Sequence, residues 1–259
     1  MGYLEELFGL KGKVAVIIGG GGVLGGSMAL ALAKAGAAVA VVDLDEEKAG
    51  ACAKQIASIG APAIALQADA SSKSALEKAA LAIDRAYHRL DVLINAPGIN
   101  SATPFFEISE QEWEQILNVN LKSMFLACQI FGKRMLEQRQ GGSIINISSA
   151  SSGPPLSKVF TYSISKAGVN NLTQFLAREW APHRIRVNAI APGFFPAEQN
   201  RRLLTKERTE AILRHTPMGR FGEPDELAGV VLWLASERAS SFVTGAIIRV
   251  DGGFSAMTI

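Results

Sequence analysis

The chain has 259 residues, 48% hydrophobic and 19% charged, so it can bury a large core and shows no sign of disorder. Its 26 basic and 24 acidic residues leave a net charge of +2, and no basic patch indicates a nucleic-acid partner. No apolar run is long enough to span a membrane, and Glu5 and Glu6 stand where a signal peptide would be basic. Cys52 and Cys128 form no CxxC pair and no histidine cluster is present, so we expect a cytoplasmic protein without a metal site.

Seven apolar, β-branched runs alternate with helical patterns along the chain. The predicted strands are Val14–Ile18, Val39–Asp43, Ala63–Gln67, Val92–Asn95, Ser143–Ile147, Arg186–Ile190 and Ala246–Val250. Their continuously apolar interiors are typical of strands buried on both faces of a parallel sheet. The predicted helices are Gly25–Ala35, Glu46–Ile59, Ser74–His88, Glu112–Gln138, Phe160–Ala181 and Pro224–Ala235.

This alternation predicts an α/β fold, with one doubly wound Rossmann domain over residues 1–259. Right-handed crossovers would give a parallel sheet of about seven strands with helices on both faces. The longest irregular region, residues 193–223, includes a helix-like piece at Ala197–His215. A long excursion after a late strand often covers a substrate, so we expect a substrate lid there.

A glycine-rich turn follows the first predicted strand and leads into an alanine-rich helix. Such glycines let the backbone bring its N–H groups against a pyrophosphate at a helix N-terminus. A glycine run alone also fits a flexible turn, but the order strand, turn, helix favours dinucleotide binding. The predicted contacts in this turn are Gly19, Gly21, Gly22, Val23, Leu24 and Gly25.

The second predicted strand ends at Asp43, which Leu44 follows. An acid at this point can accept hydrogen bonds from both hydroxyls of the adenosine ribose and would repel a 2′-phosphate, which favours NAD over NADP. The alternative is a solvated acid at a strand end. We prefer the ribose role because no basic residue follows until Lys48.

Two further strand ends carry predicted cofactor contacts. Asp69 and Ala70 follow the third strand, although Asp69 is nearly as well explained as the cap of a turn with Ser71 and Ser72. The fourth strand closes where the sheet order should reverse and the cofactor should lie. The predicted contacts there are Asn95, Ala96 and Gly98.

Tyr162 and Lys166 are four residues apart in a predicted helix and therefore share a face. Tyrosine is a poor base at neutral pH because its ordinary pKa is near 10. A lysine ammonium and a positive nicotinamide ring nearby would favour the phenolate, so we expect Tyr162 to have a lowered pKa. Taken alone, such a pair could also lie on the surface.

Polar residues around this pair favour a catalytic role. Ser149 lies just past the fifth predicted strand, where its hydroxyl could hold a substrate oxygen while Tyr162 exchanges its proton. Three neighbours compete for that role, namely Ser148, Ser151 and Ser152. Asn120 lies inside an apolar helical face, which indicates a buried network or a held water.

Together these motifs resemble the short-chain dehydrogenase/reductase family, in its single-domain branch, over nearly the whole chain. The matching residues are the turn 19–25, Asp69, 95–98, Asn120, Ser149, 162–166, Pro192-Gly193 and 250–253. The resemblance implies that Ser149 orients the substrate, Tyr162 is the acid/base and Lys166 binds the nicotinamide ribose. It implies that Asn120 holds a water, that the protein is a homotetramer, and that the cofactor contacts include Tyr162, Lys166, Pro192, Gly193 and Phe195.

The sequence departs from the family pattern at several positions, although every catalytic group is present. Ile18 replaces a threonine and Val23 replaces the middle glycine of the turn, which shifts phosphate contacts toward Gly20–Gly22. Ala96-Pro97 replaces Asn-Ala and removes a polar contact between strands. Ala197 stands where a threonine often helps to hold the carboxamide.

The substrate prediction rests on the segment that follows Pro192-Gly193. Two aromatics precede Gln199, Asn200 and Arg201, and a guanidinium binds a carboxylate through two parallel hydrogen bonds. This run and the segment 215–224 resemble relatives that reduce keto sugar acids, such as fructuronate to mannonate. We therefore predict an NAD-dependent enzyme that interconverts a secondary alcohol and a ketone on a mannonate- or gluconate-type acid, with Ser151, Gln199, Asn200 and Arg201 contacting the substrate. The alternative for Arg201 is that it solvates the lid.

Two other functions remain open at this point. A 3-oxoacyl-carrier-protein reductase would dock an acidic carrier on basic residues of the lid, which are Arg201, Arg202, Lys206, Arg208 and Arg214. Such reductases usually prefer NADP, and Asp43 argues against that cofactor. A non-catalytic NAD-binding regulator should lack at least one of Ser149, Tyr162 and Lys166, yet all three are present.

Overall fold

The computed structural model describes residues 2–196 and 205–257. Seven strands form one sheet in the order β3-β2-β1-β4-β5-β6-β7, and every neighbouring pair is parallel. The strands are β1 Val14–Ile18, β2 Ala38–Asp43, β3 Ala63–Gln67, β4 Val92–Asn95, β5 Gly142–Ile147, β6 Ile185–Pro192 and β7 Ile247–Val250. The doubly wound sheet predicted from the sequence is confirmed.

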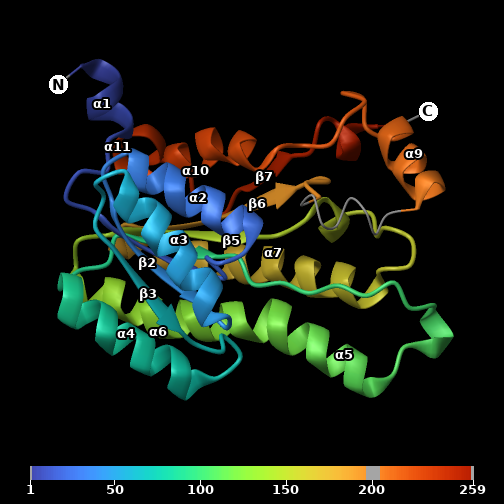
Figure 1. Cartoon of the computed structure of the whole chain (residues 1–259), viewed down its shortest axis with the longest axis horizontal. Coiled ribbons are helices and arrows are strands. Elements are labelled where there is room, and N and C mark those ends of the chain that lie inside the picture. The colour runs from blue at the N-terminus through green and yellow to red at the C-terminus, as the bar shows by residue number, and fades with distance from the viewer. Residues whose placement is uncertain (1, 197–204, 258–259) are drawn as a thin grey trace.

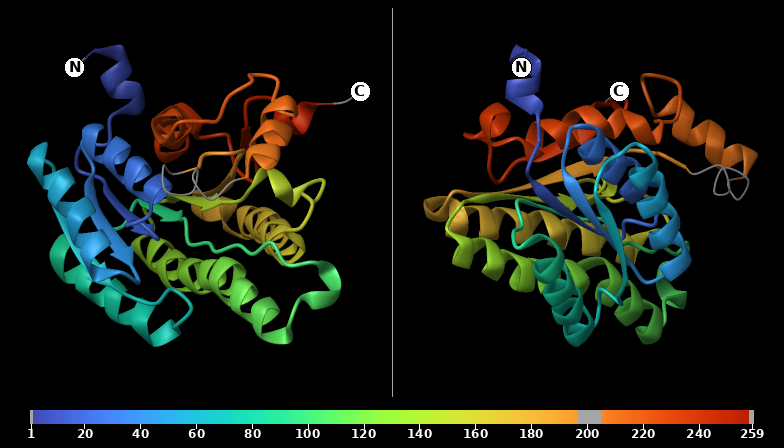
Figure 2. Two further views of the ribbon diagram at one scale, coloured as in Figure 1. Left: turned by 45° about the vertical axis from the view of Figure 1, so that its right-hand side comes forward. Right: turned by 60° about the vertical axis from the view of Figure 1, so that its left-hand side comes forward.

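Helices cover both faces of the sheet (Figure 1). On one face lie α2 Val23–Lys34, α3 Glu46–Ser58 and α10 Ala228–Ala235; on the other lie α4 Lys73–Tyr87, α6 Ser123–Gln138 and α7 Phe160–Trp180. The remaining helices are α1 Tyr3–Phe8, α5 Glu110–Leu117, α9 Lys206–Arg214 and α11 Glu237–Ser240. The rotated views of Figure 2 keep the same three layers of helix, sheet and helix.

Strand pleating divides the core into two parts. In β1, Ala15 and Ile17 pack into the cluster beneath α2, α3 and α10, whereas Val16 and Ile18 pack beneath α4, α6 and α7. Because successive side chains point to opposite faces, a strand covered on both sides must be apolar at every position. This explains why the continuous apolar runs predicted the strands so closely.

The sheet order reverses at β1, which pairs with β2 on one side and β4 on the other. In the register, Ile18 lies opposite Val42 and Asn95, so β1, β2 and β4 end at one edge of the sheet. Ligands of doubly wound proteins bind outside the carboxyl ends of the strands at such a switch point. The predicted cofactor residues of the first half of the chain therefore gather at this edge.

The predicted long helix Glu112–Gln138 is divided in the structure. Helix α5 begins at Glu110 because the hydroxyl of Ser109 accepts a hydrogen bond from Glu112 N at 3.1 Å. A π-helical turn over Asn118–Lys122 then joins α5 to α6. The predicted helix Pro224–Ala235 likewise begins with a 3₁₀ turn over Pro224–Leu227 before α10. The short helices α1 and α11 were not predicted, because too few residues show a period.

The predicted lid, residues 193–223, lies partly outside the described residues, as does much of its predicted helix Ala197–His215. The described residues of the predicted lid include helix α9. This helix is capped by Thr205, whose side chain accepts a hydrogen bond from Arg208 N at 3.2 Å. Figure 1 shows α9 near the carboxyl ends of β6 and β7. Within the described residues, no helix is both long and apolar enough to cross a membrane.

Candidate active site

The glycine turn packs tightly against neighbouring backbone. Gly19 has φ +76°, and a Cβ there would lie 3.0 Å from the Ala96 carbonyl carbon and from Pro97 N. A Cβ on Gly25 would overlap the carbonyl oxygen of Gly19. These positions require glycine because α2 and the loop after β4 both approach the turn closely.

The turn leads directly into the N-terminus of α2. Gly22 is the N-cap and has no side chain that could bind the N–H groups of the first turn. The first backbone hydrogen bond of the helix runs from Gly26 N to Gly22 O at 2.7 Å. The N–H groups of Val23, Leu24 and Gly25 therefore have no acceptor within the helix, and the helix dipole adds positive potential there. These residues fit a pyrophosphate group.

Asp43, the residue predicted to bind the ribose, lies at the end of β2 along the same edge. Its Oδ2 accepts from Gly21 N at 2.9 Å and its Oδ1 from Asp45 N at 3.1 Å. Leu44 and Val23 are 67% and 51% exposed, so apolar surface flanks this carboxylate. A carboxylate between exposed apolar side chains fits the adenosine half of a dinucleotide.

Two other predicted cofactor residues direct their side chains elsewhere. Asp69 Oδ1 accepts from Ser71 N and Ser71 Oγ at 2.8 and 2.7 Å, so this acid caps its own turn, as the alternative interpretation expected. Asn95 is fully buried and its Nδ2 donates to Asn146 Oδ1 at 2.8 Å and toward Cys128 Sγ. Its Oδ1 is buried and has no hydrogen-bond partner among the described residues.

The residues that follow these two lie nearer the surface. Ala70 is half-buried and packs against the core beneath α4. Ala96 N donates to Ile18 O at 2.9 Å, which joins the loop after β4 to β1. Gly98 is exposed, and a Cβ there would lie 3.5 Å from Lys166 Nζ. The loop after β4 thus runs from the glycine turn to the lysine.

Lys166 is buried on α7 and its Nζ donates to Ile147 O, the last residue of β5, at 2.8 Å. Burial disfavours the charged ammonium and lowers the pKa of Lys166 to about 7. The Nζ atom lies 5.7 Å from the centre of the Tyr162 ring, so the predicted pair does share a face.

The pKa of Tyr162 shifts in the direction opposite to the one expected from the sequence. Burial raises it, and a hydrogen bond with the Ser149 side chain offsets part of the rise. The sequence argument weighed only the neighbouring charge, whereas loss of hydration favours the neutral phenol and also weakens the charge on Lys166. Within the protein itself, desolvation is the larger effect.

The structure distinguishes Ser149 from its three neighbours. Ser148 Oγ donates to Asn170 Oδ1 on α7 at 2.6 Å, and Ser152 Oγ donates to the backbone oxygen of Ser149 at 2.6 Å. Ser151 is buried with its Oγ 3.1 Å from Ser149 Oγ, so the predicted substrate residue faces Ser149. Of these hydroxyls, that of Ser149 is the one that contacts the phenol.

Asn120 lies in the π-helical turn and is fully buried. Its Oδ1 accepts from Ile99 N at 2.8 Å, and its Nδ2 donates to Ile99 O at 2.9 Å and to Ser165 Oγ at 3.0 Å. Ser165 Oγ in turn donates to Tyr162 O at 2.6 Å. Asn120 therefore joins the loop after β4 to the helix of Tyr162. The sequence did not single out Ser165, although it lies between the two catalytic candidates.

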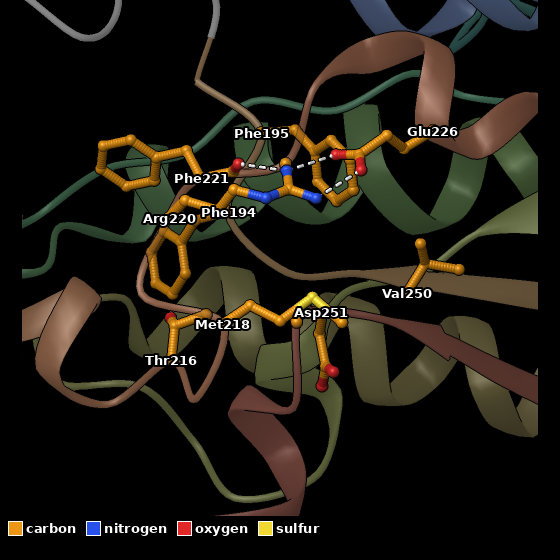
Figure 3. Close-up of a pocket in the computed structure, with 11 residues that line it drawn as sticks. Phe194, Phe195, Thr216, Met218, Arg220, Phe221, Glu226, Val250 and Asp251 are labelled. Atoms are coloured by element: carbon orange, nitrogen blue, oxygen red, sulfur yellow. Dashed lines mark hydrogen bonds and ion pairs between the residues drawn. The ribbon is translucent and has the colours of Figure 1, made fainter.

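Aromatic residues of the predicted lid pack beside the end of β6. Gly193 N donates to Val250 O at 2.9 Å, which ties the residue after Pro192 to β7. The ring of Phe195 packs on Gly222 and lines a small pocket with the Arg220–Glu226 ion pair (Figure 3). The predicted substrate residues Gln199, Asn200 and Arg201 lie outside the described residues.

An open cavity of about 610 Å³ lies beside Ser149 and is lined by Asn170 on α7 and Arg249 on β7. Tyr162, Lys166 and Asn120 do not line this cavity. The described residues nevertheless bring these three residues together with Ser149, and they place the glycine turn and Asp43 along the same edge of the sheet. The arrangement can bind a dinucleotide and hold a proton donor over its far end.

Comparison with known proteins places the chain among dehydrogenases. A family model described as enoyl-(acyl carrier protein) reductase matches residues 22–255. The chain is 41% identical to the uncharacterized oxidoreductase UxuB of Bacillus subtilis, with 95% of this chain and 96% of that protein covered. It is 38% identical to the 2-dehydro-3-deoxy-D-gluconate 5-dehydrogenase of Escherichia coli, with 96% and 98% covered.

Solved structures of related proteins have the same fold over nearly the whole chain. A short-chain type dehydrogenase/reductase from Mycobacterium marinum has a TM-score of 0.90 at 35% identity, covering 96% of this chain and 98% of that one. A putative D-mannonate oxidoreductase from Haemophilus influenza with bound NAD has a TM-score of 0.93 at 37% identity, covering 98% and 99%. A gluconate 5-dehydrogenase from Burkholderia cenocepacia, in complex with NADP and tartrate, has a TM-score of 0.93 at 32% identity, covering 99% and 100%.

Proposed function

Because the chain belongs to the short-chain dehydrogenase/reductase family, whose enzymes use a nicotinamide cofactor, we propose that it interconverts a secondary alcohol and a ketone on a sugar acid with NAD. The observation that carries the proposal is the cluster of Ser149, Tyr162 and Lys166 at the carboxyl edge of the sheet. The non-catalytic regulator considered above is disfavoured because none of these groups is missing.

The bound nicotinamide supplies or accepts the hydride. In alcohol oxidation, the Ser149 hydroxyl holds the substrate oxygen and Tyr162 takes the hydroxyl proton; in ketone reduction, Tyr162 returns it. Since burial raises the pKa of Tyr162, its phenol is protonated at neutral pH in the protein alone and can donate its proton in ketone reduction. Lys166, whose Nζ donates to Ile147 O, would hold the ribose hydroxyls of a bound nicotinamide nucleotide.

Three features support the assignment of cofactor contacts. The tight glycine positions 19 and 25 form a cradle that side chains would fill. The free N–H groups at the start of α2 suit the pyrophosphate, and Asp43 suits the ribose of NAD. Relatives with NAD and with NADP are both known, so the preference for NAD rests on Asp43.

The sugar-acid substrate is supported by relatives whose names specify gluconate-type or mannonate-type acids. Steady-state rates with NADH should be measured on keto acids of the fructuronate and 5-ketogluconate type, and on the neutral ketose fructose. We expect kcat/KM at least tenfold higher for a keto acid than for the neutral sugar, since one charged hydrogen-bonded contact is worth about 1.5–3 kcal/mol. Equal values for acids and neutral sugars would remove the substrate assignment.

The same panel should include a 3-oxoacyl thioester, which tests the carrier-protein alternative. Two of the lid cations proposed to dock a carrier have partners within the protein. Arg208 donates to Ser157 Oγ at 3.0 Å, and Arg214 is 3.6 Å from Glu210. The homotetrameric assembly, the cytoplasmic location, the single domain and the lid stay predictions from the sequence.

A further inference from the structure

Lys48 adjoins the predicted ribose site. The sequence analysis had discounted this cation because of its distance from Asp43 along the chain. A Cβ on Gly21 would lie 2.7 Å from Lys48 Cβ and 3.0 Å from Asp43 Oδ2. Lys48 and Asp43 therefore flank the same glycine of the turn. The stem of Lys48 packs beneath the backbone that should hold the ribose, and its flexible end can move along this edge.

Asp45 engages that cation. The Lys48 ammonium lies 2.9 Å from Asp45 Oδ2, while Asp45 Oδ1 caps α3 by accepting from Lys48 N at 3.1 Å. The side chains of Lys48 and Asp45 are 66% and 41% exposed. An exposed pair of this kind is weakly held, so the ammonium can exchange partners when a stronger anion arrives.

The charges at this edge determine how strongly a 2′-phosphate is repelled. Asp43 and Asp45 contribute two negative charges and Lys48 one positive charge, which leaves one net negative charge beside a group that itself carries nearly two. Asp43 alone would repel a 2′-phosphate, but Lys48 is close enough to offset that repulsion if it is released. The electrostatic coupling of Lys48 to both acids, which raises its pKa, agrees with this geometry.

We propose that Asp45 is a second determinant of cofactor choice: by pairing with Lys48 it withholds a cation that would otherwise neutralise a 2′-phosphate beside Asp43. The inference rests on the proposed function only in that the adenosine ribose lies against Asp43. It assigns discrimination between NAD and NADP to an acid–base pair at the start of α3 in addition to the acid at the end of β2.

The test is a set of binding titrations in which no substrate is present. NADH and NADPH are titrated by nicotinamide fluorescence, and 5′-ADP and 2′,5′-ADP by calorimetry, on the full chain. Asp45→Asn keeps the helix cap, because asparagine caps as well as aspartate, but removes the charge that holds Lys48. Glu46→Gln is the matched control, since it removes an exposed acid from the same helix turn.

We expect Asp45→Asn to tighten NADPH and 2′,5′-ADP binding about fivefold, the size of one exposed charge interaction, with NADH and 5′-ADP within twofold of wild type. Adding Lys48→Gln should abolish the gain. The proposal is overturned if Glu46→Gln gives the same gain, if the gain survives Lys48→Gln, or if Asp45→Asn leaves NADPH binding unchanged while NADH binds. Wild-type protein that binds neither dinucleotide overturns the proposed function as well.

Discussion

Tyr162 and Lys166 are both buried, and burial favours the neutral form of each: it raises the pKa of the phenol and lowers that of the ammonium to about 7. The Ser149 side chain opposes the first effect through its hydrogen bond with the phenol. At the scale of single residues, Tyr162 is thus a proton donor whose pKa is partly lowered by the Ser149 hydroxyl. Beside it, Lys166 has a pKa close to neutral pH.

Replacing Ser149 by alanine should move the pH profile of the enzyme. The hydroxyl lowers the pKa of Tyr162, so its loss raises that pKa further. Alcohol oxidation requires the phenolate, so the rising limb of kcat plotted against pH should shift to higher pH. The value of kcat should also fall by about 10²-fold or more. The check is kcat against pH for both proteins, and an unshifted limb would show that Ser149 does not act on the phenol.

Lys166 should also affect stability in a pH-dependent way. Its pKa falls from 10.5 to about 7 on folding, so between these values the unfolded chain binds more protons and the folded protein gains stability as pH rises. Lys166→Met removes this linkage. The difference in urea midpoint, variant minus wild type, should be highest at pH 7 and should decrease toward pH 9. A constant difference would mean that the lysine is not desolvated.

At the scale of elements, the strand ends and the first turn of α2 set the positions of these residues. Gly25 faces the carbonyl oxygen of Gly19, whereas Gly26, one residue later, has space: its Cβ would lie 3.5 Å from Gly20 O and 3.7 Å from Cys52 Sγ. The glycines of this helix turn are therefore not equivalent.

Gly25→Ala should displace α2 from the turn and weaken NADH binding by at least tenfold, since the pyrophosphate depends on the position of the helix N-terminus. Gly26→Ala is the matched control and should bind NADH as wild type does. It should also be slightly more stable, because alanine is favoured over glycine in helices by about 1 kcal/mol. Fluorescence titration and thermal unfolding measure both effects. Equal NADH affinity in the two variants would contradict the assigned phosphate site.

Most elements could be predicted because the buried parallel strands are apolar at most positions and the helices between them show a clear period. The division of the long helix at Asn118–Lys122 could not, since one π turn barely alters that period. Asn95 was predicted as a cofactor contact from its position at a strand end, and the partners of its side chain could not be foreseen. Pleating directs this side chain toward Cys128 on α6, on the side of the sheet opposite to Ile94.

Within the site, the sequence yielded the residue types but not their environment. The residue pattern alone left four serines as candidates, and Ser149 was chosen partly by the family resemblance. The structural distinction depends on the hydrogen bonds of Ser148 and Ser152 with α7 and the backbone. The residue pattern also left out the desolvation that raises the pKa of Tyr162 in the protein alone, since burial of a helix face is a tertiary property. Lys48 was judged by its distance along the chain, although it packs against the glycine turn.

At the scale of the whole molecule, large apolar side chains remain exposed on the helices of one face. Phe125 lies on α6, and Ile164 and Phe175 lie about three turns apart on the same side of α7. An apolar surface of this kind is typical of an interface between subunits. It supports the predicted homotetramer, in which these helices would pair with a second copy.

Phe175→Glu should dissociate that assembly, because a carboxylate would be buried in the proposed interface. Light scattering coupled to gel filtration should give a tetramer for wild type and a smaller species for the variant, with circular dichroism unchanged. Gln55→Glu, at an exposed position of α3 on the opposite face of the sheet, serves as the control for one added charge. A monomeric wild type would contradict the prediction.

The central claim is that the phenol of Tyr162 exchanges the proton of the substrate oxygen, and Tyr162→Phe tests it most directly. The substitution keeps the ring and removes only the hydroxyl. With the sugar acid that wild type reduces best, kcat should fall by about 10²–10⁴-fold while NADH affinity stays within twofold. Turnover equal to that of wild type would contradict the account.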